Sequence, residues 1–266
     1  MKKILFLVLV AAILAGCNPG KVRNKTLSAE EKYSLPEKSF HGTFQADLSM
    51  DIPVKYDEEA VLEKLRNSIV ENVLGEEYVQ VDDEDLLPGF IENMRSAYIA
   101  DNVSNVNNMY EDDMSYNLEY ILKASNIRND GTIYSYETNS YVYMGGAHGM
   151  LTLTYYNYDL NNGDIITEED IFVAGSEEFL AGHIRKNLVS LSSGELIPED
   201  EHGTIYCVTA PNGNFYVEDD GIVYVYNPYE IAPYAYGHTK AKLLFSDIKE
   251  VLTEHSPLSY LIDKPM

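Results

Sequence analysis

A change in hydrophobic period near Met114 constrains the fold of this chain more than any other feature. From there on, apolar and aromatic residues alternate with polar ones, which is typical of β-strands with one buried face. Three such segments follow one another, at residues 114–127, 131–144 and 149–160. All three are rich in tyrosine, and the turn signal NNGD at residues 161–164 ends the last one. The sequence therefore predicts a central meander of three long antiparallel strands.

Helical and strand-like patterns flank the predicted meander on both sides. Before it come a strand at residues 40–54 and two helical patterns, at 57–75 and 81–106. After it come a helix that begins near Ser176, a hairpin that turns at Asp220–Gly221, and a last strand followed by a helix. Because helices do not alternate strictly with strands, a doubly wound parallel sheet is not expected. The predicted fold class is α+β, with antiparallel sheets, helices packed on one face, and two lobes.

The first residues of the chain have the pattern of a bacterial lipoprotein signal. A short basic start, MKK, precedes an apolar stretch that is too short for a comfortable membrane span. The sequence LAGC then places small residues directly before Cys17, which resembles the lipobox of bacterial lipoproteins. This resemblance implies cleavage after residue 16, lipidation of Cys17 with diacylglycerol and a further acyl group such as palmitate, and membrane anchoring in the cell envelope.

Composition divides the remaining chain into a polar segment and two candidate domains. Residues 17–38 are polar and show no period, so they are expected to form the lipid anchor and a flexible tether. A break near residue 140 divides the rest into domains at 39–139 and 140–255. Removing 16 of the 266 residues leaves 250, which is enough for two small domains with their own cores.

Charge and cysteine content restrict the classes of partner and site. The formal net charge is −24, and it becomes −26 when Lys2 and Lys3 leave with the signal. Such a chain is not expected to bind nucleic acid, which requires clustered Lys and Arg, but it would attract a cationic partner. With Cys17 lipidated, Cys207 has no partner for an intrachain disulfide. No pattern of metal ligands or cofactor fingerprint is found, so neither a metal nor a cofactor is expected.

The segment YVYMGGAHGM, residues 141–150, is the first candidate site. Gly145 and Gly146 interrupt a strand pattern beside His148, and the glycines are expected to permit a bulge or a close backbone approach. A catalytic histidine needs an orienting group and a nucleophile or metal within reach, and no sequence neighbour of His148 is such a group. The structural interpretation is therefore favoured, and contact with a ligand stays the alternative.

The loop NPYEIAPYAYGH, residues 227–238, is the stronger candidate for partner binding. Its prolines stiffen the loop and reduce the entropy lost on docking, while its tyrosines offer large amphipathic contact areas. The candidate residues here are Pro228, Tyr229, Glu230, Pro233, Tyr234 and Tyr236. The alternative is a buried loop, held by its tyrosines, that only connects two strands.

Two long motifs resemble a known envelope module. They are YVYMGGAHGMLTLTYYNYDLNNGDIITEEDIF at residues 141–172 and FYVEDDGIVYVYNPYEIAPYAYGHTKAKLLFSDIKEVL at residues 215–252. Residues 140–252 are similar to the extracellular module shared by the anti-sigma factor RsiV and the peptidoglycan deacetylase PdaC, a domain of unknown function. Residues 39–139 resemble the domain that precedes this module in PdaC-like proteins.

The resemblance implies a binding function rather than an enzymatic one. In RsiV the module binds lysozyme, whereas no anti-sigma segment and no deacetylase domain are recognised in this chain. The expected function is a non-enzymatic envelope lipoprotein that binds a protein or cell-wall partner, such as a lysozyme-like muramidase or peptidoglycan. The alternative is an envelope hydrolase that acts on cell-wall glycan or peptide, with a site near His148, Glu230 and His238.

Lipidation is tested by Cys17→Ser. Without the thiol no diacylglycerol can be attached, so the variant should accumulate as a soluble or uncleaved precursor that radioactive palmitate does not label. The measurement is palmitate incorporation in growing cells, with the unchanged chain as the control. Label retained by the variant would overturn the assignment.

Overall fold

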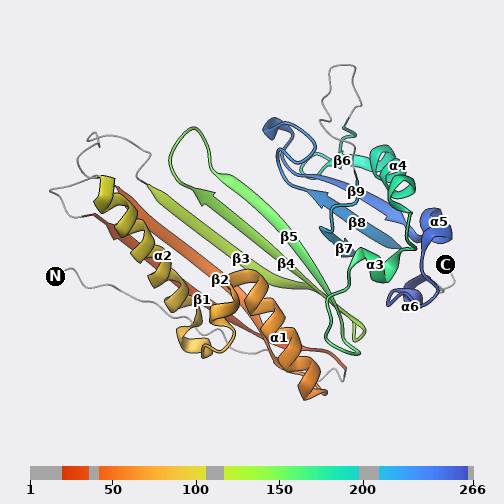
Figure 1. The fold of residues 1–266 in the computed structure, drawn as a ribbon, viewed down its shortest axis with the longest axis horizontal. Coiled ribbons are helices and arrows are strands. Elements are labelled where there is room, and N and C mark those ends of the chain that lie inside the picture. The colour runs from red at the N-terminus through yellow and green to blue at the C-terminus, as the bar shows by residue number, and fades with distance from the viewer. Residues whose placement is uncertain (1–19, 36–41, 106–116, 198–209, 263–266) are drawn as a thin grey trace. The chain divides into compact units, whose positions relative to one another are not determined.

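The computed structural model describes residues 20–35, 42–105, 117–197 and 210–262, so the signal sequence, Cys17 and Cys207 lie outside the described residues (Figure 1). The chain forms two compact units. The first contains residues up to 125 together with 138–151, and the second contains residues 126–137 together with those from 152 onward. No helix in the described segments is long and apolar enough to cross a membrane. The predicted boundary between residues 139 and 140 stays a prediction.

A five-stranded sheet with the order β1-β2-β3-β4-β5 runs through the structure (Figure 1). Its strands are β1 Arg23–Ser34, β2 Thr43–Lys55, β3 Leu118–Asn129, β4 Ile133–Tyr143 and β5 Met150–Asp159. The predicted meander of three long consecutive strands is confirmed, because β3, β4 and β5 are neighbours in this order. One pairing differs from the prediction of antiparallel sheets, since β2 and β3 run parallel, with Phe44 opposite Leu118. A parallel pair needs a long crossover connection, and the two helical segments between the strands supply it.

Strand β2 and two helices build the core of the first unit. Every second residue of β2 is buried, from Phe44 to Ile52, as expected for a strand with one covered face. Helix α1, Glu59–Leu74, buries Val61, Leu65 and Ile69, which follow the predicted helical stripe. Helix α2, Asp83–Asn105, lies beside it on the same sheet, where the Tyr98 ring packs 5.7 Å from the Phe44 ring. The short helix η1, Glu76–Tyr78, connects the two helices.

Strand β1 corrects the prediction of a flexible tether at residues 17–38. Residues 23–34 pair with β2 in one long antiparallel ladder, from Arg23 opposite Lys55 to Ser34 opposite Thr43. Leu27 and Ala29 are buried at alternate positions, and the next inward position is occupied by Glu31. The alternation was missed because this inward residue is charged.

An ion pair explains how Glu31 is accommodated in the interior. Its carboxylate lies 3.2 Å from Nη1 of Arg95 in α2, and the two side chains are only 3% and 13% exposed. The Arg95 guanidinium also lies over the Tyr33 ring and pairs with Glu92. Burial raises the pKa of the Glu31 carboxyl, and the charge of Arg95 opposes that shift. The pair therefore holds β1 to α2.

The second unit is built on a smaller antiparallel sheet with the order β6-β9-β8-β7. The strands are β6 Leu188–Ser190, β7 Phe215–Val217, β8 Gly221–Tyr226 and β9 Thr239–Leu244. The short helices are α3 Glu168–Ile171, α4 Glu177–Asn187, η4 Tyr234–Tyr236, α5 Phe245–Ile248, η5 Lys249–Val251 and α6 Ser259–Ile262. The predicted hairpin at Asp220–Gly221 is confirmed as the β7–β8 turn, where Glu218 N–H donates to Gly221 O.

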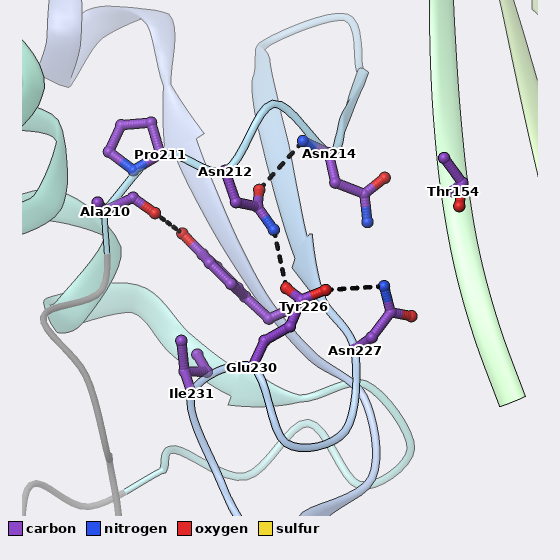
Figure 2. Close-up of a pocket in the computed structure, with 9 residues that line it drawn as sticks. All are labelled: Thr154, Ala210, Pro211, Asn212, Asn214, Tyr226, Asn227, Glu230 and Ile231. Atoms are coloured by element: carbon purple, nitrogen blue, oxygen red, sulfur yellow. Dashed lines mark hydrogen bonds between the residues drawn. The ribbon is translucent and has the colours of Figure 1, made fainter. Parts of the chain in front are cut away.

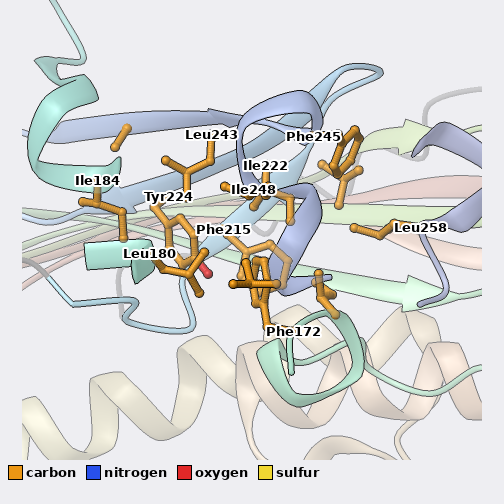
Figure 3. Packing of buried hydrophobic residues seen from close by; sticks show 14 of the residues in the cluster. Phe172, Leu180, Ile184, Phe215, Ile222, Tyr224, Leu243, Phe245, Ile248 and Leu258 are labelled. Atoms are coloured by element: carbon orange, nitrogen blue, oxygen red, sulfur yellow. The ribbon is translucent and has the colours of Figure 1, made fainter. Parts of the chain in front are cut away.

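Strand β8 is buried at all six positions. Ile222, Tyr224 and Tyr226 belong to the main core cluster, which includes residues from α4 and α5 (Figure 3). Val225 faces the opposite side and packs in a second cluster with Leu153 and Tyr155 of β5. Because alternate residues of a strand face opposite sides, both faces of β8 must be covered. The loop that follows β8, residues 227–238, therefore begins at a fixed position on the sheet.

The buried ion pair of the first unit predicts a pH-dependent loss of stability in Arg95→Ala. The variant leaves the Glu31 carboxylate buried without its cation, so the free energy of unfolding at neutral pH should fall by about 3 kcal/mol. The folded-state pKa of Glu31 then rises further above its unfolded value. The destabilisation relative to the unchanged chain should therefore shrink as the pH falls toward the ordinary pKa of the carboxyl, and grow as the pH rises.

Native-state hydrogen exchange of β1 and β2 amides measures this loss within the first unit. The matched control is the double variant Glu31→Leu with Arg95→Met, which removes both charges and should restore most of the stability. A loss in Arg95→Ala that does not change with pH would contradict the ion-pair account.

Candidate functional site

The loop between β8 and β9, residues 227–238, is rigid and only partly buried. Pro228, Ile231 and Ala232 are buried and attach it to the core of the second unit. Two backbone hydrogen bonds close its first turn, from Tyr229 N to Ala232 O at 3.0 Å and from Glu230 N to Asn227 O at 3.1 Å. Two more form the short helix η4. The loop is therefore pre-shaped, which lowers the entropy cost of binding.

The loop presents two tyrosines to solvent. Tyr229 is 54% exposed and Tyr234 is 36% exposed, and their ring centroids lie 5.6 Å apart. Tyr236 instead packs against the core, so it supports the loop. Pro233 is half-buried. The expectation of an aromatic contact surface thus fits Tyr229 and Tyr234, whereas the alternative of a buried tyrosine applies to Tyr236.

Tyr229 has a strained backbone. Its φ of 73° lies in the left-handed region, and no other non-glycine residue in the described parts of the chain has a positive φ. Such a conformation costs an L-residue about 1–2 kcal/mol. The two turn hydrogen bonds and the buried residues on either side hold it in place. Strain of this kind is retained where the surrounding structure dictates it, and it is concentrated at functional sites.

The carboxylate of Glu230 is positioned by two amides. Asn212 Nδ2 donates to Oε2 and Asn227 Nδ2 donates to Oε1, both at 3.1 Å (Figure 2). No Lys, Arg or His forms an ion pair with Glu230 among the described residues. The carboxylate is exposed and is held by neutral donors. This arrangement is suited to a cationic group brought by a partner.

Asn227 of the loop and Asn214, which precedes β7, both pair with β5. Asn227 accepts from Leu153 N at 2.7 Å and donates to Leu153 O at 3.2 Å, so its amide pairs with the strand as a peptide group would. Asn214 accepts from Tyr155 N at 2.9 Å and donates to Leu153 O at 3.0 Å. The outer edge of β5 is thereby paired with side chains at these two residues.

A pocket of about 570 Å³ lies between these groups (Figure 2). Its lining residues are Thr154, Ala210, Pro211, Asn212, Asn214, Tyr226, Asn227, Glu230 and Ile231. A second pocket of about 600 Å³ shares Thr154, Asn212 and Asn214, and contains Glu168 and Glu169. Neither pocket is lined by Lys or Arg among the described residues, and the charged residues that line them are Glu230 in the first and Glu168 and Glu169 in the second.

The buried Tyr226 reports this acidic environment. Its hydroxyl donates to Ala210 O at 2.7 Å. Burial raises the pKa of Tyr226, and the carboxylates of Glu168 and Glu230 raise it further. Two carboxylates thus act on this buried hydroxyl, and no Lys or Arg lines either pocket among the described residues.

The bend at residues 145–148 belongs to the first unit. Gly145 and Gly146 have φ of 88° and 91°, which confirms that the backbone conformation requires glycine. A Cβ at the nearby Gly149 would lie 2.4 Å from the Tyr141 ring. His148 is exposed, and its Nδ1 lies 3.0 Å from Gly149 O. A Cβ added at Gly146 would meet nothing within 4 Å, so the close approach in this bend is at Gly149. The role of His148 in binding stays a prediction.

The residues of the proposed hydrolase alternative are distributed over both units. His148 is in the first unit, whereas Glu230 and His238 are in the second. The side chains that hold the Glu230 carboxylate in the described structure are amides. In the described residues, no group of three or more His, Cys, Asp or Glu side chains could hold a metal ion.

Sequence reasoning missed Asn212, Asn214 and Asn227. The segment PNGN at residues 211–214 has the composition of a turn, and Asn227 stands before a proline, so the local pattern of both segments indicates turn chemistry. Nothing local indicates that the amides of Asn214 and Asn227 reach a strand about 60–75 residues away in sequence.

The amide pairing predicts that Asn227→Ala destabilises the second unit. The change leaves the N–H of Leu153 without its partner, removes one of the two amides that donate to the Leu153 C=O, and releases Glu230, at a cost of about 2 kcal/mol. Hydrogen exchange of the β8 amides is the measurement. The control is Asn187→Ala, which removes an exposed amide that donates to His183 O of its own helix and should change stability by less than about 0.5 kcal/mol. Equal effects of the two variants would contradict the pairing.

Three family models match consecutive parts of the chain. Residues 1–18 match the prokaryotic membrane lipoprotein lipid attachment site, residues 42–151 match deacetylase PdaC, and residues 169–246 match a protein of unknown function, DUF3298. The PdaC match ends at Leu151, where the first compact unit also ends. The resemblance predicted from the sequence is confirmed. No curated protein matches the chain.

Two solved structures share the fold. A DUF3298 family member from Bacteroides fragilis superposes with a TM-score of 0.81 at 20% identity, over 91% of this chain and 98% of that one. A DUF3298 family protein from Pseudomonas aeruginosa has a TM-score of 0.54 at 18% identity, over 86% and 94%. The chain is thus a membrane-anchored envelope lipoprotein in which a region that matches the PdaC model is followed by one that matches the DUF3298 model.

Proposed function

We propose that this lipoprotein is a non-enzymatic binding module for a cationic protein of the cell envelope, and that the 227–238 loop is its contact surface. The observation that carries the proposal is the Glu230 carboxylate, which two amides orient and no described cation neutralises, beside two exposed tyrosines. In a specific interface, aromatic side chains lose their water on binding and supply most of the affinity. Charged residues at the rim of the interface steer the partner toward it.

Three properties of the site favour binding of a macromolecule over turnover. The loop is closed by backbone hydrogen bonds, so it needs little ordering when a partner docks. The backbone of Tyr229 is strained, and its large side chain is exposed to solvent. The acid at the centre is fixed by amides, whereas a general acid or base needs a nucleophile, a metal or a second titratable group within reach.

A lysozyme-like muramidase is the first partner to test. The support is the net charge of −26 on the mature chain, the acidic pocket beside the loop, and the resemblance to a lysozyme-binding module. Peptidoglycan is the other partner of the same compartment, and it serves as the comparison ligand in the same assay.

The double variant Tyr229→Ala with Tyr234→Ala tests the contact surface. It should weaken binding of lysozyme by at least ~30-fold, or about 2 kcal/mol, because both aromatic anchors are lost. Glu230→Gln should mainly lower the association rate and flatten its salt dependence, since a rim charge steers the encounter. Surface-plasmon kinetics on residues 18–266 at two ionic strengths measure both effects.

Matched controls separate binding from stability. Leu196→Ala removes an exposed apolar side chain of the same unit, and Glu250→Gln removes an exposed acid, so neither should change the kinetics. Melting temperatures are compared in parallel. If the double variant Tyr229→Ala, Tyr234→Ala melts at the normal temperature and still binds lysozyme with unchanged affinity, the 227–238 loop is not the contact surface. Release of products from peptidoglycan that disappears in His148→Ala would instead establish the hydrolase.

A further inference from the structure

The pocket beside the 227–238 loop combines one carboxylate with apolar walls. Its volume is about 570 Å³, and all of its lining residues belong to the second unit. Ala210, Pro211 and Ile231 line it with aliphatic atoms, and Glu230 is the only charged residue among its described lining. A long side chain with an apolar stem and a cationic end matches this combination, because the stem can lie along apolar surface while the end meets the carboxylate.

The Glu230 carboxylate has unused hydrogen-bonding capacity. A carboxylate offers about four lone-pair sites, two on each oxygen. Asn212 occupies one site on Oε2 and Asn227 one site on Oε1, each at 3.1 Å, and in Figure 2 the two amides approach from opposite sides. No other described residue donates to these oxygens, so each oxygen retains one site. Two adjacent acceptors in a fixed orientation form the acceptor half of a bidentate hydrogen-bond pair.

A guanidinium fits these two acceptor sites better than an ammonium does. A guanidinium is planar and presents parallel N–H groups that can bond both oxygens of one carboxylate, whereas an ammonium is a compact charge without this fork geometry. A guanidinium is also more weakly hydrated than an ammonium. Because Asn212 and Asn227 already orient the carboxylate, little ordering is needed on the acceptor side when the guanidinium arrives.

The charged residues that line the pocket and its neighbour have one sign. The adjoining pocket of about 600 Å³, which shares three lining residues with the first, contains Glu168 and Glu169. Burial raises the pKa of Tyr226, and the carboxylates of Glu168 and Glu230 raise it further, so both carboxylates act on the same part of the pocket. A cationic side chain in the first pocket would therefore be attracted by more than one carboxylate.

The described cations of the second unit do not occupy this site. Arg128, Arg185 and Lys242 form ion pairs with acids that line neither pocket. The other described lysines and histidines of this unit also line neither pocket. The two remaining sites on the Glu230 carboxylate are therefore available to a cation brought by another molecule.

We propose that this pocket is an arginine site, which receives one arginine side chain of the partner and bonds its guanidinium with both oxygens of Glu230. The inference rests on the proposed function, because the arginine belongs to the cationic partner that contacts Tyr229 and Tyr234. It adds that the partner is recognised by guanidinium geometry as well as by charge. A partner with an arginine at its contact surface should bind more tightly than one of equal charge with a lysine there.

Three small probes distinguish guanidinium recognition from attraction by charge. Nα-acetyl-arginine amide carries the guanidinium, Nα-acetyl-lysine amide carries the same charge as an ammonium, and Nα-acetyl-citrulline amide has the arginine shape without the charge. Each probe is titrated at millimolar concentrations into the isotope-labelled mature chain without its lipid, residues 18–266, which keeps every described residue. The side-chain amide resonances of Asn212 and Asn227 report binding. The arginine probe should bind at least ~5-fold more tightly than the lysine probe, and the citrulline probe should leave the resonances unshifted.

Variants of Glu230 test whether its carboxylate is the recognition group. Glu230→Gln keeps the size of the side chain but loses the charge and one acceptor, so it should weaken binding of the arginine probe at least ~10-fold. Glu230→Asp keeps the charge but withdraws the carboxylate by one methylene, so it should remove the preference for arginine over lysine. The control, Glu250→Gln, removes an exposed acid of the same unit outside both pockets and should change neither affinity. Backbone amide spectra verify that each variant is folded.

Two results would overturn the proposal. One is equal affinity of the unchanged chain for the arginine and lysine probes, which would reduce the site to a general attraction of cations. The other is arginine binding that persists in a folded Glu230→Gln chain. If lysozyme binding still requires Tyr229 and Tyr234 alongside either result, the proposed function stands without an arginine site. Conversely, arginine binding at Asn212 and Asn227 without any binding of lysozyme supports the site and contradicts the choice of lysozyme as the partner.

Discussion

The second unit depends on the burial of β8 on both of its faces. One face carries Tyr224 and Tyr226 into the main core, and the other carries Val225 against Leu153 of β5. A strand enclosed in this way cannot shift its register, because a slip of one residue would exchange its two faces. Gly221 begins the strand at a point where a Cβ would lie 2.3 Å from the Leu243 carbonyl oxygen. The position from which the 227–238 loop starts is fixed by these contacts.

The polar part of the site follows from the same constraint. Since β8 packs against β5, Asn214 and Asn227 at the ends of β7 and β8 are close enough to pair with the backbone of Leu153. Asn227 also donates to Glu230, so the amide that fastens the loop orients its charge as well. The stability of the unit and the geometry of its acidic surface therefore share one set of hydrogen bonds. Such sharing makes the surface rigid, and rigidity favours a partner of fixed shape.

Local patterns were sufficient for much of this fold. The alternation in β2, the meander of β3, β4 and β5, and the Asp220–Gly221 turn each depend on residues close in sequence, and the structure has them where the patterns predict. The exposed Tyr229 and Tyr234 were also identified from the composition of their loop. In all these cases, the residue that decides the local structure lies within the segment.

The features that the sequence did not predict depend on residues that are far apart in the chain. Strand β1 was read as a tether because Glu31 occupies an inward position, and only Arg95 on a distant helix makes that acceptable. The parallel pairing of β2 with β3 has no local sequence signal, since neighbours in a sheet are chosen by the packing of the helices between them. The hydrogen bonds from Asn214 and Asn227 to Leu153 also have no local sequence signal. Each miss is a polar or pairing contact between residues far apart in the chain.

The parallel pairing of β2 and β3 also sets an order of folding. The β1–β2 hairpin is local and closes quickly, but β3 joins β2 only after residues 56–117 have been bridged. Closing a loop of that length costs about 4 kcal/mol of chain entropy beyond a constant term, so this step is slow. A lipoprotein enters the envelope with its N-terminus first, and the hairpin therefore forms while the unpaired side of β2 still awaits β3. In that interval the open edge of β2 is unpaired, and an open strand edge of this kind can pair with another chain.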